Sequence, residues 1–443
     1  MTQSVLTSNI GAAQRRTVIV LVITQIIGTV GVGVAPSIGV LLAGEVTDNE
    51  AWAGLARTAS TLGAALLGLP LGTLAARRGR RVALSTGWWV AAIGAAILVV
   101  AAQWNLAVPL FIGLLFIGSG SAVSLQSRFA ATDLAEPRHK ARSLALIVWV
   151  GTLGSVLGPN LGAPGQLIGA ATGLTVFASA FLIAAVCLAL AGTIVFLVLR
   201  PDPLLLQADL THGTAEAKPR GRRGGIRRIF AEIRVNRPAR TAVIAILTAQ
   251  VVMVSIMTMT PVHMVHQGGS VNLVGITISL HILGMYALAP VVGWVTDRYG
   301  HRCAIWTGIS IFLLSLVIGG VWPDDTGWII ASLILLGIGW SFVNVAGSAL
   351  FAATVSGEVR AASQGGVDAL SNLCGATAAF AAGPLLALSS FSTLSIIAIA
   401  CLLPLAFFIA RTPKGIGGTG GPGGKPPGVD ASSAVSRNPS MRK

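Results

Sequence analysis

The most prominent feature of the chain is a succession of long apolar runs separated by short polar segments. Each run approaches or exceeds the roughly 20 residues that an α-helix needs to cross the hydrocarbon core of a bilayer. Helices are required there because backbone polar groups in lipid must be hydrogen-bonded within their own segment. The pattern therefore predicts an all-α integral membrane protein with twelve transmembrane helices. The predicted spans are residues 17–43, 52–75, 82–102, 106–134, 143–165, 173–199, 241–264, 272–296, 303–322, 328–355, 363–388 and 393–411.

Basic residues divide the connections between these spans into two sets. Alternate connections, around residues 44–51, 103–105, 166–172, 265–271, 323–327 and 389–392, contain no Lys or Arg. The other connections and the middle segment 200–240 contain many. Cytoplasmic loops of membrane proteins carry the excess of Lys and Arg. We therefore expect a multi-pass protein of the plasma (inner) membrane, with both termini and the middle segment cytoplasmic.

The two halves of the chain resemble each other. Gly72 corresponds to Gly293, 221 positions later, and the pair Gly158–Pro159 corresponds to a Gly-Pro pair 225 positions later. Each half contains six spans, so both halves have the same orientation. Such parallel repeats place a substrate site near the bilayer midplane between two bundles. We therefore predict two pseudo-symmetric six-helix bundles, residues 17–199 and 241–411.

Three polar segments flank the bundles: an N-terminal segment at 1–16, a linker at 200–240 and a tail at 412–443. Within the linker, Ile226, Phe230 and Ile233 share one helical face, opposite most of the arginines. This pattern fits a short basic amphipathic helix on the anionic inner leaflet, and it fits a solvated linker equally well. The tail is rich in Gly, Pro and Ser, which is typical of disorder.

Composition excludes several classes of function. Only 10% of the residues are charged, and the net charge of +15 resides mainly in loops and tails, which argues against a nucleic-acid partner. The four cysteines have no metal-ligand spacing, so we expect no metal and no cofactor. No phosphate-binding loop and no cluster of catalytic residues is present, so we expect no enzyme. The expected partners are a small-molecule substrate, protons and the lipid bilayer, and we expect a monomer.

A basic corner lies between the second and third spans, with the sequence GTLAARRGRR, and a related corner, GWVTDRYGHR, follows the eighth span. With twelve spans and a long middle loop, these corners make the chain resemble the major facilitator superfamily, whose pattern there is G-x-L-A-D-R-x-G-R-[KR]. Ala76 stands in place of the usual aspartate. The first corner matches at Gly72, Leu74, Ala75, Arg77, Gly79, Arg80 and Arg81, and the second at Gly293, Asp297, Arg298, Gly300 and Arg302.

The resemblance implies that both corners, together with Arg142, form latches that shut the cytoplasmic side, the first facing span 11 and the second facing span 5. Because Ala76 replaces the acid, Asp297 is expected to be the main gating carboxylate. Asp133 is the expected partner of Arg77. The alternative is that the arginines only set the topology.

The fifth span contains Gly154, Gly158, Pro159 and Gly162 in a pattern similar to G-x-x-x-G-P-x-x-G-[GA] of drug:proton antiporters. In relatives this segment is thought to limit leak through the central cavity. The alternative is a generic close-packing face of small residues. The fourth-span arginine linked to proton coupling in relatives is absent, since Leu114 occupies its position, and alignment does not transfer its role to Arg128.

Few charged groups lie inside the spans, where charges are costly and usually face a cavity. Asp368 is the only carboxylate well inside a span, and it shares one helical face with Gln364 and Asn372. Asp368 is either the proton-titrating group or a fixed member of a salt bridge or helix cap. The remaining cavity or proton-coupling candidates are Arg128, His281, Asn344 and Gln25, with hydrogen-bonded packing as the alternative for His281.

These observations predict a secondary transporter that works by alternating access. The fifth-span motif favours proton-coupled efflux of small organic or drug-like compounds. The small number of acids and the missing fourth-span arginine keep a second hypothesis open, an uptake symporter or facilitator for a small metabolite.

Overall fold

The computed structural model describes residues 3–49, 51–136, 139–211, 236–355 and 357–411, and this part of the chain is helical almost throughout. The first half contains α1 (Gln3–Gly33), η1 (Ala35–Gly39), α2 (Val40–Thr47), α3 (Ala51–Trp104), α4 (Ala107–Ala130), α5 (Lys140–Leu157), η3 (Gly158–Leu161), α6 (Gly162–Thr172) and α7 (Val176–Val198). A connecting helix, α8 (Pro203–Thr211), follows. The second half contains α10 (Arg237–His266), α11 (Val271–Tyr286), α12 (Ala289–Tyr299), α13 (His301–Val321), α14 (Thr326–Thr354), α15 (Gly357–Leu388) and α16 (Phe391–Ala410).

Eleven helical segments among the described residues are long and apolar enough to cross a membrane. One of them, Trp52–Trp104, has 53 residues, enough for two crossings. Gly79 divides it, because its backbone angles (φ 86°, ψ 172°) are not helical and are accessible mainly to glycine. Counted as two crossings, α3 brings the total to the twelve transmembrane helices that the apolar runs predicted.

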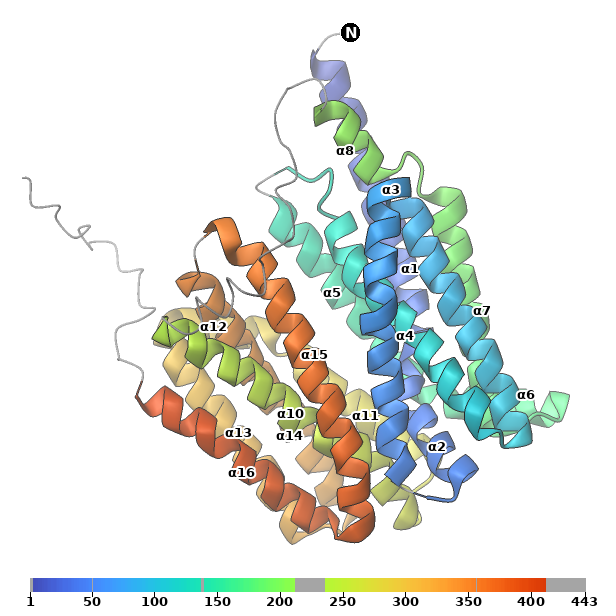
Figure 1. Cartoon of the computed structure of the whole chain (residues 1–443), viewed down its shortest axis with the longest axis vertical. Coiled ribbons are helices and arrows are strands. Elements are labelled where there is room, and N and C mark those ends of the chain that lie inside the picture. Colours follow the sequence, from blue (N-terminus) through green and yellow to red (C-terminus); the bar gives the residue numbers. More distant parts are fainter. Residues whose placement is uncertain (1–2, 50, 137–138, 212–235, 356, 412–443) are drawn as a thin grey trace, which may run out of the picture.

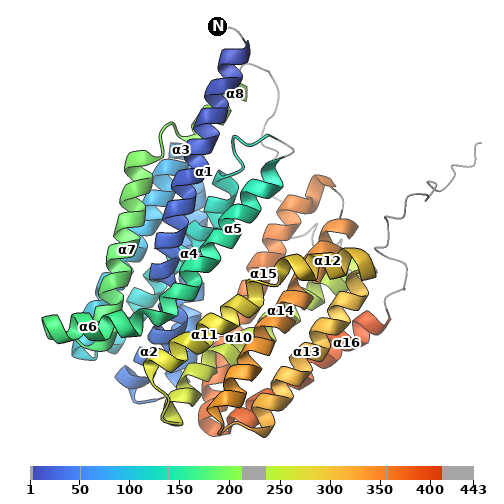
Figure 2. The same cartoon turned by 180° about the vertical axis from the view of Figure 1, so that it is seen from behind.

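The helices form two bundles, each with its own apolar core. The core of the first half includes the fully buried side chains of Leu114, Trp88 and Phe181, and that of the second half includes Phe312 and Phe351. Figures 1 and 2 show that the bundles meet at one end and lean apart toward the end that carries α8 and the start of α1. The predicted pair of pseudo-symmetric six-helix bundles is therefore confirmed.

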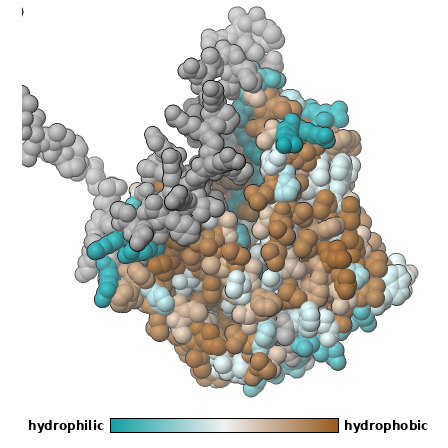
Figure 3. All heavy atoms as spheres, viewed as in Figure 1, coloured by the Kyte–Doolittle hydropathy of each residue, from teal (hydrophilic) through white to brown (hydrophobic). Residues whose placement is uncertain are grey.

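Hydrophobic side chains cover most of the flank of both bundles, and hydrophilic ones gather toward the two ends (Figure 3). Large apolar side chains such as Leu69, Leu167 and Leu403 are more than half exposed on the model surface. A surface of this kind belongs in lipid rather than in water. The chain is thus a membrane-embedded, multi-pass protein.

Local structure departs from the predicted spans at two places. The connection expected at 166–172 is helical, since α6 continues the fifth span beyond a short 3-10 turn at Gly158–Leu161. Pro159 lies in that turn, and proline cannot donate the backbone hydrogen bond that would continue α5. The segment before the first span is helical from Gln3 onward. The predicted amphipathic helix around 226–234 and the tail at 412–443 lie outside the described residues.

Candidate functional site

The two bundles are joined at one end by close contacts between α3 and α15. Gly54 of α3 lies directly against the backbone of Ala379, so any side chain at position 54 would overlap its carbonyl group. One turn later, the buried hydroxyl of Thr58 lies 2.9 Å from the carbonyl oxygen of Ala376, to which it can donate. A glycine and a hydroxyl on one half thus contact the bare backbone of the other.

A second contact of the same kind joins α11 to α5 and η3. Gly275 lies against the backbone of Pro159. One turn later, the hydroxyl oxygen of Ser279 lies 2.6 Å from the carbonyl oxygen of Val156, and the Asn160 amide donates to Ser279 Oγ over 2.6 Å. The second contact therefore repeats the first, with serine in place of threonine.

The repeat in the sequence relates these two contacts. Gly275 follows Gly54 by 221 positions, and Ser279 follows Thr58 by the same 221. We call the end of the molecule where they lie the sealed end. Because both contacts bond to carbonyl oxygens in the opposite half, they hold the bundles together there while leaving the rest of the interface free to separate.

The opposite end, which we call the basic end, carries both arginine-rich corners. A side chain added at Gly72 or Gly293 would meet nothing within 4 Å, so neither corner packs against a helix at this glycine. Gly79 and Gly300, again 221 positions apart, have nearly equal φ angles of 86° and 85°. The corners are thus related in backbone conformation.

The first corner is held by two acids of its own half. Arg80 forms a two-point ion pair with Asp133, with distances of 2.8 Å from Nε and 3.3 Å from Nη2. Asp133 thus pairs with Arg80 in this structure, whereas the family resemblance led us to expect Arg77. The backbone N–H of Arg81 donates to Asp202 over 2.7 Å. Asp202, which sequence reasoning missed, also accepts from the first turn of α8.

The second corner is built differently. Asp297 is exposed and forms no ion pair among the described residues. Arg298 is exposed beside the Tyr299 ring, and Arg302 donates to the carbonyl of Ala410 over 3.2 Å. Among the other gating candidates, Arg77 and Arg142 are exposed.

Electrostatic interactions link charged and aromatic groups of the two halves. Arg128 of α4 interacts electrostatically with Asp368 of α15 and with Tyr286 of α11. Arg57 of α3 interacts with the same Tyr286. We call these four residues the central cluster. Two of its members, Arg57 and Tyr286, were not among the predicted site residues.

Aromatic and amide side chains surround Tyr286 in the second half. The rings of Tyr286 and Trp340 are 5.8 Å apart in an edge-to-face arrangement, and Trp340 Nε1 donates to Gln250 over 3.3 Å. Gln250 follows Gln25 by 225 positions, and Gln25 of α1 in turn donates to Ser124 of α4 over 2.5 Å. Glutamines related by the sequence repeat thus form hydrogen bonds between helices in both halves.

The remaining residues predicted to line the cavity differ in burial. Asn344 is half-buried on α14, and Asn372 is exposed on α15, one turn beyond Asp368. Gln364 lies one turn before Asp368 on the same helix. His281 is fully buried inside the second half, where its Nδ1 lies 2.7 Å from the carbonyl oxygen of Leu333 on α14. Its surroundings are those of a hydrogen-bonded packing residue.

The fifth-span glycines pack against both halves of the molecule. Gly154 and Gly158 pack against α1 of their own half, where Thr29 and Gly33 leave no room for a side chain. Gly162 instead faces Val271 of α11, across the interface between the halves. The motif is therefore a packing face at its start and part of the sealed end at its finish.

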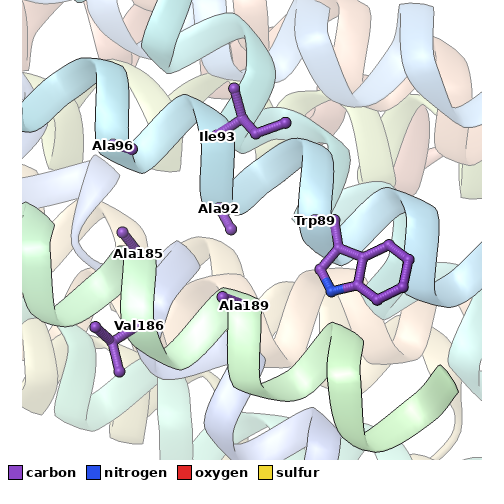
Figure 4. Close-up of a pocket in the computed structure, with 7 residues that line it drawn as sticks. All are labelled: Trp89, Ala92, Ile93, Ala96, Ala185, Val186 and Ala189. Carbon is purple, nitrogen blue, oxygen red and sulfur yellow. The ribbon is translucent and has the colours of Figure 1, made fainter. Parts of the chain in front are cut away.

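A shallow pocket between α3 and α7 lies away from this site (Figure 4). It is lined by Trp89, Ile93, Val186 and four alanines, without a charged group. Its walls are part of the apolar flank, so it is a lipid-facing groove rather than a transport pathway. Within the described ranges, no group of three or more His, Cys, Asp or Glu residues is arranged to hold a metal ion.

Comparison with known proteins agrees with this architecture. The family model described as Major Facilitator Superfamily matches residues 17–270 and 263–441. The chain belongs to this superfamily. One superfamily relative, the uncharacterized MFS-type transporter YdeG of Bacillus subtilis (strain 168), is 36% identical over 386 residues, which cover 86% of this chain and 88% of YdeG.

A second relative is the riboflavin transporter RfnT of Brucella anthropi. It is 29% identical over 412 residues, covering 91% of this chain and 98% of RfnT. Among solved structures, the nucleoside transporter NupG has a TM-score of 0.66 at 15% identity, covering 90% of this chain and 100% of NupG. An inward-facing, unoccupied bacterial homolog of the human lysosomal transporter Spinster has a TM-score of 0.65 at 15% identity, covering 90% of this chain and 96% of the homolog. These structures share the fold.

Proposed function

We propose that this transporter couples the entry of protons to the efflux of small organic compounds by alternating access. The observation that carries the proposal is the central cluster. Asp368 from one half interacts with Arg128 from the other, and a carboxylate in that position can accept a proton and lose its attraction to the arginine. Protonation would then change an interaction between the halves, as coupling requires.

The sealed and basic ends supply the conformational part of the proposal. Because Lys and Arg mark the cytoplasmic side of membrane proteins, we assign the basic end to the cytoplasm and this conformation to the inward-open state. The hydrogen bonds of Thr58 and Ser279 hold the outer side shut. In the outward-open state those bonds break, and the corners close on the other half, with Asp297 as the gating acid. Both termini are then cytoplasmic, and the protein acts as a monomer in the plasma membrane.

The direct test uses inside-out membrane vesicles energised by respiration, with a pH-sensitive dye outside or within. Addition of an exported compound is expected to dissipate the preformed proton gradient. Asp368→Asn is expected to abolish this response, whereas Asp324→Asn, an exposed acid at the sealed end, retains it. No response from a broad panel of organic compounds, or an unchanged response in Asp368→Asn, would contradict the proposal.

A second function, uptake of a small planar metabolite, is favoured by one observation. RfnT is named a riboflavin transporter, and the Tyr286–Trp340 ring pair offers a stacking surface for a planar compound. Right-side-out vesicles distinguish the two functions. Gradient-dependent accumulation of a compound inside them indicates uptake, and its exclusion indicates efflux.

A further inference from the structure

The lipid-facing groove between α3 and α7 is hollow because small side chains line it. Ala92 and Ala96 of α3, with Ala185 and Ala189 of α7, leave a space of about 480 Å³. Trp89 lies at one end of the groove and Ala96 at the other (Figure 4). Large apolar side chains cover much of the rest of the flank, so the groove is a local depression in a surface that otherwise projects into lipid.

Two arginines lie at one level beyond the Trp89 end of this groove. Gly79 faces Asp202, because a side chain at position 79 would collide with that carboxylate. Arg81 follows Gly79 by two residues, and Arg200 precedes Asp202 by two residues on a segment that runs in the opposite direction. The backbones at Arg81 and Arg200 are therefore level with each other, at the basic end of the two helices.

Aromatic contacts connect the groove to the first of these arginines. The ring centres of Trp89 and Phe196 are 5.3 Å apart, and the Arg81 guanidinium lies 5.3 Å from the centre of the Phe196 ring. Arg81 precedes Trp89 by eight residues, which is about 12 Å along an α-helix. One leaflet of the hydrocarbon core is about 15 Å thick. A lipid whose headgroup contacts Arg81 would thus have the lower part of an acyl chain at the level of the groove.

The charge at this end of the groove is positive. Among the described residues, the Arg81 guanidinium forms no ion pair or hydrogen bond, and Arg200 is exposed. The Asp202 carboxylate at this level is bound by backbone N–H groups, including that of Arg81. In the second half the corresponding arginine, Arg302, donates to the carbonyl oxygen of Ala410 instead. The first half thus presents guanidinium groups that are available to an anion at the membrane surface.

From these contacts we infer that the groove binds an anionic phospholipid, with the phosphate at Arg81 and Arg200 and an acyl chain between α3 and α7. Guanidinium groups bind phosphate through paired hydrogen bonds, and basic pockets between transmembrane helices recognise anionic headgroups. A zwitterionic headgroup would bring a positive group to the same two arginines, so the anionic lipid is preferred. The site lies on the flank of the first half, away from the central cluster, and its occupant is a lipid rather than the transported compound.

Two lipids with identical acyl chains test the headgroup preference. Dioleoylphosphatidylglycerol is anionic, and dioleoylphosphatidylcholine is zwitterionic. Each is titrated into the purified full-length protein in a non-ionic detergent, and native mass spectrometry measures the dissociation constant of the first lipid bound. Each arginine near an anionic headgroup contributes about fivefold in affinity, so we expect phosphatidylglycerol to bind at least about tenfold more tightly. Glycerol phosphate, which has no acyl chain, is not expected to displace it.

Variants assign the preference to residues. Arg81→Gln and Arg200→Gln are each expected to reduce the preference for phosphatidylglycerol about fivefold, and the double variant to abolish it. The bond to Asp202 comes from the backbone of residue 81, so it remains in Arg81→Gln. Arg81→Lys retains the charge and most of the preference, which controls for misfolding. Arg142→Gln, which removes an exposed arginine of α5, leaves the preference unchanged.

A further variant tests the groove itself. Ala96 is exposed, so Ala96→Phe fills the groove without displacing the core, and it is expected to weaken binding of both lipids several-fold. Equal binding of the two lipids to the parent protein would overturn the inference, as would a preference that persists in the double variant or unchanged affinities in Ala96→Phe. Displacement by glycerol phosphate would assign the arginines to a free phosphate and would also overturn it. No substrate or proton gradient takes part in this measurement, so its result is independent of the transport experiments.

Discussion

The two basic corners have related sequences and nearly identical backbone turns, yet they use their acids differently. In the first corner, where Ala76 replaces the motif aspartate, Asp133 and Asp202 of the same half bind the corner. In the second corner Asp297 is present and exposed. The first corner is thereby fastened to its own bundle, whereas the second retains a carboxylate that is available to the opposite half. Where a motif acid is lost, acids elsewhere in the same half can thus take over the binding of the corner. The corner is then bound to its own half.

The largest expected difference in stability is between substitutions of the two turn glycines, Gly79 and Gly300. Alanine at either position is strained by the positive φ angle, which costs about 1–3 kcal/mol. At position 79 the added methyl group would also collide with the Asp202 carboxylate, whereas position 300 faces open space. Gly79→Ala is therefore expected to lower the free energy of unfolding by about 3 kcal/mol, and Gly300→Ala by about half as much. Reversible unfolding in mixed micelles, followed by circular dichroism, measures both. Equal losses would show that the Asp202 contact is unimportant.

The next effect concerns the ion pair of the first corner. The side chains of Arg80 and Asp133 are only 15% and 10% exposed. Asp133→Asn is expected to reduce the free energy of unfolding by about 1–2 kcal/mol, since a charged hydrogen bond is lost at a partly shielded site. A double-mutant cycle with Arg80→Gln isolates the pair, and the same cycle with Arg77→Gln is the matched control. A larger coupling to Arg77 would reverse the assignment of the partner.

A smaller effect on stability, but a measurable one on transport, is expected at the second corner. Because Asp297 makes no ion pair among the described residues, Asp297→Asn is expected to leave the free energy of unfolding within about 0.5 kcal/mol of the parent. If the carboxylate closes the basic end, the same substitution reduces transport about fivefold, which corresponds to roughly 1 kcal/mol between conformations. Unchanged transport at unchanged expression would exclude Asp297 as a gating acid.

The smallest effect is expected where the motif acid is restored. Ala76 is exposed, and the nearby Arg80 already has a partner. Ala76→Asp is therefore expected to change the free energy of unfolding by less than about 0.5 kcal/mol. Stabilisation well above that figure would mean that Asp133 and Asp202 leave the first corner electrostatically incomplete.

The helices and their repeat were predictable because both follow from residue order. An apolar run long enough to span a membrane must form a helix, because its backbone polar groups have no other partners in lipid. Motif residues that recur at similar distances along the chain, such as Gly72 and Gly293, show the duplication directly. The helical continuation into α6 was not predicted, because residues 166–172 form a short segment flanked by glycines and lie beyond the 3-10 turn that contains Pro159.

The partners within the site were less predictable, since they depend on distances between elements far apart in the sequence. Nothing in the order of residues distinguishes Arg77 from Arg80 as the partner of Asp133, and nothing in it links Arg57 to Tyr286. Thr58 and Ser279 did have a signal, because each follows a glycine by four residues at the same offset of 221. Their hydroxyl groups therefore follow the same internal repeat as the glycines.

The hydrogen bonds at the sealed end terminate on carbonyl oxygens, and this has a consequence for evolution. Ala376 and Val156 accept through atoms that every amino acid possesses, so substitutions there do not require a compensating change at Thr58 or Ser279. The donors are constrained in chemical type, whereas the acceptors are constrained only in size. Sequences of relatives should consequently show little pairwise covariation at these contacts. Methods that infer contacts from covariation would then overlook the positions that hold the two halves together.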